Sequence, residues 1–146
     1  ALRLSAMILV VTGLGGSLSE ILKGTPAVDY ISSLFADYGL PAILLPFVIG
    51  IIGNMITGST TVGVITAASL VAPMLPSLAL SPEAAMLAGA SGSVIIKYVN
   101  SSYFWVCTSL SKLSANDAIL GYGGATLVGG IVSFIVVWLL WGFGFI

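Results

Sequence analysis

Residues 54–68, NMITGSTTVGVITAA, place a cluster of small polar side chains at the centre of the longest uncharged run in this sequence. No charged residue occurs between Asp37 and Glu83, a run of 45 positions. A straight helix of that length would extend about 68 Å, more than twice the roughly 30 Å thickness of a bilayer's hydrocarbon core. The run is therefore expected to turn back on itself.

Prolines near both ends of the run indicate where it turns. The midpoint between Pro41 and Pro76 falls inside the segment TGSTT. Arms at about 42–56 and 62–75 would each reach only about 20 Å, which is enough for mid-membrane but not for a comfortable crossing. We therefore predict a re-entrant helical hairpin over residues 38–80, with TGSTT at its tip.

The composition of the chain indicates an integral membrane protein. Of 146 residues, 58% are hydrophobic and only 6% are charged, with a mean hydropathy of +1.18, whereas soluble domains carry about 25% charged residues. A net charge of −1 provides no basic face for nucleic acid. With no histidine and a single cysteine, Cys107, the usual nucleophile–base pairs are missing. We expect neither an enzyme nor a metal site.

Three further segments show membrane character. Residues 1–19 are apolar enough for a span. If residues 20–37 form a helix, their apolar side chains lie on one face and their polar side chains on the other, which predicts an interfacial arm helix. The uncharged C-terminal stretch predicts a final transmembrane helix over residues 117–144, with tryptophans suited to an interfacial belt.

Residues 83–112 predict a broken helix. One half is expected at 84–96 and a second half from Tyr103 to about Lys112, with a non-helical stretch between them. Lys97 lies in that stretch, and a charge at the bilayer centre costs about 2.5–3.5 kcal/mol on insertion scales. It should therefore face protein or a water-filled cavity. The small residues GASGS at 89–93 are expected to pack helices closely.

Two interruptions of membrane helices in one chain are typical of a transporter site. At each interruption one helix ends with free carbonyls, which suit a cation, and the next begins with free N–H groups, which suit an anion. Hydroxyl and amide side chains there can bind a polyhydroxy solute or cap the second helix. The candidate solute- and ion-binding residues are Asn54, Thr57, Gly58, Ser59, Thr60, Thr61, Lys97, Asn100, Ser101 and Ser102.

The segments GSTTVGVITAASLVAPML and AGASGSVIIKYVNSSYFW resemble the gluconate:proton symporter (GntP) family. The resemblance covers nearly the whole chain, as the C-terminal part of a longer transporter of the ion-transporter superfamily. It implies an all-α integral membrane fold. That fold consists of one transport-domain repeat with a span, an interfacial arm, a re-entrant hairpin, a broken helix and a final transmembrane helix. The family motif has histidine where Tyr98 stands and serine where Lys97 stands, so the proton-coupling group is left unassigned.

The resemblance implies cation-coupled uptake of a small hydroxy-carboxylate such as gluconate across the bacterial inner membrane. The expected coupling ion is the proton, with sodium as the alternative, and no other cofactor is expected. Expected partners are a small organic anion, membrane lipid, further copies in an oligomer and the remaining repeat of the transporter. That repeat would come from the rest of the chain, a separate chain or a second copy. Alternatives are a non-transporting membrane subunit that packs against a partner, and a channel-like pore formed by oligomerisation.

Overall fold

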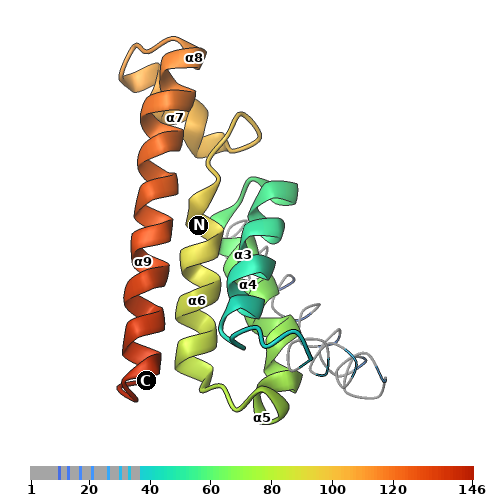
Figure 1. The fold of residues 1–146 in the computed structure, drawn as a ribbon. Coiled ribbons are helices and arrows are strands. Elements are labelled where there is room, and N and C mark those ends of the chain that lie inside the picture. The colour runs from blue at the N-terminus through green and yellow to red at the C-terminus, as the bar shows by residue number, and fades with distance from the viewer. Residues whose placement is uncertain are drawn as a thin grey trace.

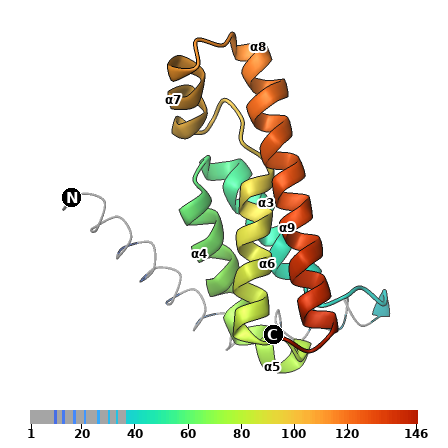
Figure 2. The ribbon, with the colours of Figure 1, turned by 90° about the vertical axis from the view of Figure 1, so that its left-hand side faces the viewer.

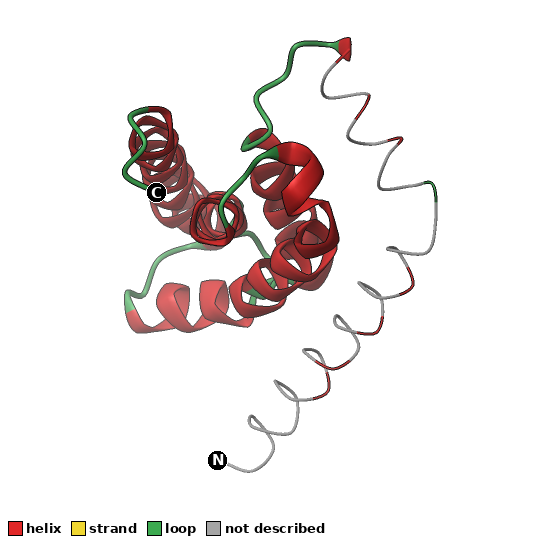
Figure 3. Cartoon of the chain, turned by 90° about the horizontal axis from the view of Figure 1, so that it is seen from below, coloured by secondary structure: helices red, strands yellow, loops and turns green. Residues whose placement is uncertain are grey.

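The computed structural model describes residues 37–146 and the single positions 10, 13, 17, 21, 26, 30 and 33. Apart from those positions, the span expected at 1–19 and the interfacial arm expected at 20–37 lie outside the described residues. Every regular element in the described part of the chain is helical (Figure 3). The all-α expectation is confirmed there.

The uncharged run folds into a helical hairpin. Helix α3 (Leu44–Thr57) and helix α4 (Thr60–Val71) run antiparallel to each other and meet at a turn (Figure 1). Gly58 makes this turn with φ 67° and ψ 7°, a left-handed conformation that favours glycine. The turn lies within the predicted TGSTT tip.

The second arm of the hairpin is longer than the first. It continues from α4 through η1 (Ala72–Met74) into α5 (Leu75–Leu78). Thr60–Leu78 is 19 residues long with a hydropathy of 1.6, so it has the length and composition of a membrane span. The re-entrant placement of the hairpin in the bilayer stays a prediction.

A helix pair interrupted by extended backbone follows the hairpin. Helix α6 (Pro82–Ile95) is followed by non-helical residues 96–101 and then by α7 (Ser102–Leu110). Ile96 is extended, with φ −110° and ψ 98°. We call residues 96–101 the break; it begins one residue before the expected position.

The C-terminal helix runs along most of the height of the described part of the chain. It comprises α8 (Ala115–Ala118), the π-helical turn η2 (Ile119–Gly123) and α9 (Gly124–Gly142) (Figure 2). Together they form a candidate span of 28 residues with a hydropathy of 2.1, about 42 Å long. It begins and ends two residues before the expected final span.

Helix α6 lies between the hairpin and α9 and contacts α3, α4 and α9 (Figures 1 and 2). Its small residues allow this close packing. A Cβ on Gly92 would collide with the backbone carbonyl of Phe47 on α3, and a Cβ on Gly50 would collide with the carbonyl of Gly89. The GASGS segment therefore packs helices closely, as the sequence predicts.

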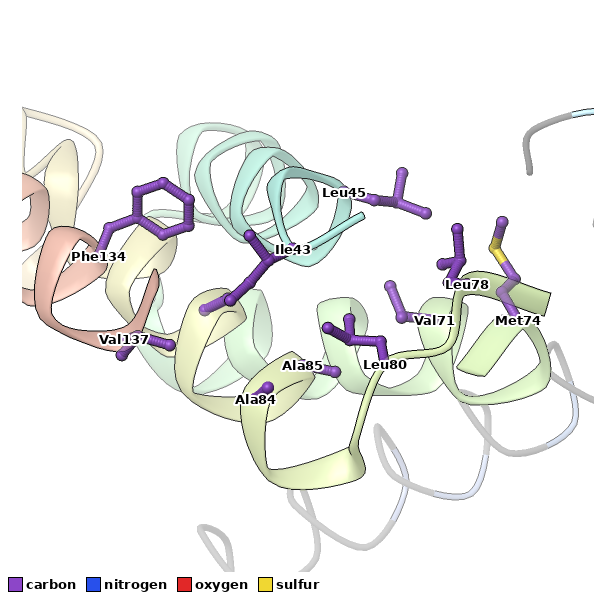
Figure 4. Packing of buried hydrophobic residues seen from close by; sticks show 11 residues of the cluster. Ile43, Leu45, Val71, Met74, Leu78, Leu80, Ala84, Ala85, Phe134 and Val137 are labelled. Atoms are coloured by element: carbon purple, nitrogen blue, oxygen red, sulfur yellow. The ribbon is translucent and has the colours of Figure 1, made fainter. Parts of the chain in front are cut away.

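The apolar core lies where the two arms of the hairpin open, at the end of the molecule near α5 (Figure 4). We call this end the base. The Phe47 and Phe134 rings stack there with centroids 3.8 Å apart, which joins α3 to α9. The buried cluster consists of Ile43, Leu45, Val71, Met74, Leu78, Leu80, Ala84, Ala85, Ala88, Phe134 and Val137.

Candidate functional site

The tip of the hairpin meets the break at the opposite end of α6 from the base. In Figure 1 the α3–α4 turn lies below α7, beside the chain that leads from α6 to α7. A Cβ on Gly58 would collide with the carbonyl of Asn100. Gly58 is therefore needed for both its φ angle and its contact with the break. We call the tip and the break together the junction.

The side chain of Lys97 connects the break to the hairpin. Lys97 lies in the break, is only 8% exposed, and directs its side chain at the hairpin. Its ammonium donates hydrogen bonds to Asn54 Oδ1 at 3.0 Å and to Thr60 Oγ1. Two interrupted segments about 40 residues apart are thus joined through one buried charge.

Asn54 holds its side chain in a fixed orientation. It is fully buried in the last turn of α3, and its Nδ2 donates to the carbonyl of Ile96. The amide's donor side therefore faces the break's backbone, and its acceptor Oδ1 faces the Lys97 ammonium. Both polar atoms of this buried amide have partners, as buried polar groups require.

A second bond joins the same two segments on the exposed side. Asn100 Nδ2 donates to the carbonyl of Met55 at 2.6 Å, and Asn100 itself is exposed. The bond satisfies one of the free carbonyls at the C-terminal end of α3. It joins neutral groups only.

The remaining tip residues divide into those that shape the turn and one that is open. Thr57 Oγ1 donates to the Gly53 carbonyl at 2.8 Å and accepts from the Ser59 N–H at 3.2 Å. Ser59 caps α4, since its Oγ accepts from the Val62 N–H at 3.4 Å. Thr61 is exposed on the first turn of α4.

The break differs from expectation in how α7 begins. Ser101 is the N-cap of α7, but its side chain makes no capping hydrogen bond. The Phe104 N–H instead donates to the Ser101 carbonyl at 3.1 Å. Ser101 is 2% exposed and Ser102 is exposed, so the expectation that these serines cap α7 is wrong for Ser101.

Sequence reasoning missed the backbone partners of the junction. The carbonyls of Met55 and Ile96 accept hydrogen bonds from Asn100 and Asn54, and no residue type marks such acceptors. The π-helical turn was also missed, although its glycines were a signal. A Cβ on Gly123 would lie 3.3 Å from the Lys97 carbonyl, so this turn packs directly against the break.

A groove of about 290 Å³ opens between the break and the π-helical turn. It is mainly apolar, and Lys97 is the charged residue in its lining. It is lined by Ile95, Ile96, Lys97, Tyr98, Ile119, Leu120, Gly123, Gly124 and Leu127. The junction therefore combines one positive charge with the exposed hydroxyl residues Thr61 and Ser102, groups that suit recognition of a small polar anion.

The family profile and the related proteins that match this chain are all permeases or transporters. The profile described as GntP family permease matches residues 1–143. The chain is 30% identical over 119 residues to a high-affinity gluconate transporter of Escherichia coli (strain K12), covering 82% of this chain and 27% of that protein. It is 31% identical over 136 residues to a D-serine transporter of the same strain, covering 92% and 31%.

A gluconate permease of Bacillus licheniformis is 33% identical over 111 residues, covering 76% of this chain and 25% of that protein. The chain thus spans less than a third of the length of each of these relatives. No solved structure matches it. The match to transporters, not enzymes, agrees with the sequence expectation. Within the described residues, two helices are long and apolar enough to cross a membrane, which fits a membrane location. The resemblance drawn from the sequence is confirmed, and the chain belongs to the GntP permease family.

Proposed function

We propose that this chain is the C-terminal transport-domain portion of a secondary transporter for a small hydroxy-carboxylate such as gluconate, driven by a coupled cation flow. The observation that carries the proposal is the junction. In a chain with 6% charged residues, a buried lysine and two asparagines join the hairpin to the break. Such irregular backbone at membrane depth is tolerated where it lines a cavity.

The charge of Lys97 supports an anionic solute. Gluconate presents one carboxylate and several hydroxyls, whereas D-serine carries an ammonium beside its carboxylate. A cation at Lys97 attracts the former as a whole and repels the ammonium of the latter. We therefore propose gluconate-like acids ahead of zwitterionic amino acids.

The outer face of α9 supports the remaining partners that we propose. Val128, Val132 and Val136 on this helix are exposed in the described chain. An apolar face of this kind suits lipid, the remaining repeat of the transporter or another copy. The proton is the coupling ion that we propose.

Solute binding is tested by thermal unfolding of the purified protein in detergent. We expect gluconate to raise the melting temperature in a saturable way, D-serine to raise it less, and the neutral polyol sorbitol least. Lys97→Met should abolish most of the preference for gluconate over sorbitol, while Lys112→Met, which removes an exposed lysine, should leave it intact. Absence of a shift with every solute would contradict the proposal and favour a packing subunit.

The membrane placement is tested by labelling single cysteines with an impermeant thiol reagent in a variant lacking Cys107. Gly39→Cys and Ala79→Cys flank the hairpin and should react from the same side of the membrane. Ser114→Cys, before α8, should react from the opposite side, because α9 spans the height between them. Reaction of Ala79→Cys and Ser114→Cys from one side would contradict this topology.

A further inference from the structure

The Lys97 ammonium is bound in the way that proteins bind a free monovalent cation. The partners that the structure gives it are two neutral oxygens, Asn54 Oδ1 and Thr60 Oγ1, which come from opposite sides of the hairpin turn. Helices α3 and α4 contain no charged residue, and the acidic residue of α6, Glu83, lies in its first turn at the far end. Among the described residues, the side-chain partners of this cation are therefore neutral oxygens, and no carboxylate is among them.

These ligands are held in place independently of Lys97. The bond from Asn54 Nδ2 to the Ile96 carbonyl fixes the amide with its oxygen facing the ammonium. Thr60 is the first residue of α4, so the position of its backbone follows from the capped start of that helix. An oxygen site that is held by other contacts remains in place when its occupant is removed.

A simple tie between the hairpin and the break does not require a charge. The Asn100–Met55 bond joins the same two segments with neutral groups. Burying an ammonium is costly unless its environment compensates it. The presence of a charge in the Lys97 contact, beside the neutral Asn100–Met55 bond, therefore calls for an electrostatic explanation. A cation site provides one, because its oxygens are aimed at a positive charge.

We propose that the junction is a monovalent-cation site whose resident cation is the Lys97 ammonium. The inference deepens the proposed function and rests on it for its consequence: a site filled by its own lysine is closed to sodium. A proton is then the coupling ion that this arrangement leaves available. Removing the lysine side chain should leave the Asn54 and Thr60 side-chain oxygens as a binding site for a small alkali cation such as sodium.

The test compares thermal unfolding of the purified protein in sodium chloride and in choline chloride at equal ionic strength. The parent should melt at the same temperature in both salts. Lys97→Ala should be less stable in choline and should gain about 4 °C in sodium at ten times the dissociation constant. The exposed Lys112→Ala serves as the matched control and should show no difference between the salts.

A second variant covers the case in which Lys97→Ala unfolds. The double change Lys97→Ala with Asn54→Asp replaces a neutral ligand by a carboxylate and should bind sodium more tightly than Lys97→Ala does. Sodium-dependent stabilisation of either variant, with none in the parent, supports the inference. Equal stabilisation of parent and variant, no sodium effect in any folded variant, or failure of both variants to fold even in sodium overturns it.

The gluconate response, measured in the same samples, separates this inference from the proposed function. A sodium effect in Lys97→Ala without any gluconate shift in the parent leaves the cation site standing and removes the proposed solute. A gluconate shift in the parent with no sodium effect in the variants supports the proposed solute and removes the cation site.

Discussion

The base and the junction lie at opposite ends of α6, and different kinds of interaction stabilise them. At the base, apolar side chains from α3, α5, α6 and α9 fill the space between helices (Figure 4). At the junction, hydrogen bonds from Lys97, Asn54 and Asn100 join the segments. In the function that we propose, the base fixes the fold while the junction binds the solute and the ion. Substitutions at the base should cost stability without altering solute binding, whereas substitutions at the junction can cost stability, alter binding or do both.

The largest effect is expected from Gly92→Ala, in the close packing of α3 against α6. Its Cβ would collide with the Phe47 carbonyl, which belongs to the backbone and cannot move aside alone. We expect a loss of about 3 kcal/mol or more in the free energy of unfolding, measured in detergent. Gly129→Ala on α9 is the control, since its Cβ would meet nothing within 4 Å. Equal losses in both variants would contradict the packing.

Phe134→Ala should produce the next largest loss. The ring is 5% exposed and stacks on Phe47, so its removal leaves a cavity between α3 and α9. We expect a loss of about 2–3 kcal/mol, below the soluble-core range because detergent and lipid are themselves apolar. Solute affinity should not change. Val132→Ala, on the exposed face of the same helix, should be nearly neutral in the same unfolding measurement.

Much of this architecture could be predicted because it depends on local features. The length of the uncharged run, its prolines and its glycine predict a turn, and the chain turns at Gly58. Lys97 and the polar residues after it predict the interruption that separates α6 from α7. Each of these features is visible within a short window of sequence.

The partners at the junction could not be predicted, because they are distant in the sequence and partly backbone. Lys97 lies 43 residues from Asn54, and the spacing of polar residues along either segment does not reveal that the two would meet. The sequence predicts that Lys97 faces protein or a water-filled cavity, but it does not identify the groups that contact the ammonium. In the structure neutral oxygens already contact it.

At the tip, substitution of Thr61 should lower solute affinity, whereas substitution of Ser59 should lower stability. Thr61 is exposed and Ser59 caps α4. Thr61→Val keeps the shape and removes the hydroxyl, so gluconate affinity should fall about tenfold, or about 1.4 kcal/mol, with unchanged melting temperature. Ser59→Ala should cost about 0.5–1 kcal/mol of stability, because its capping bond is long at 3.4 Å. Loss of stability in Thr61→Val would instead indicate a packing role.

Of the two asparagine bonds across the junction, the smaller effect is expected from Asn100→Ala, which removes the neutral bond to the Met55 carbonyl. Asn100 is exposed, so water in the cavity that the break lines can replace its hydrogen bond, and the loss in unfolding free energy should be about 0.5–1 kcal/mol. Asn54→Ala is the matched comparison across the junction. It leaves the Ile96 carbonyl and the Lys97 ammonium without this partner in a buried place, so it should cost two to three times as much. Equal costs for the two asparagines, measured under one set of unfolding conditions, would mean that burial and charge do not distinguish the two ties.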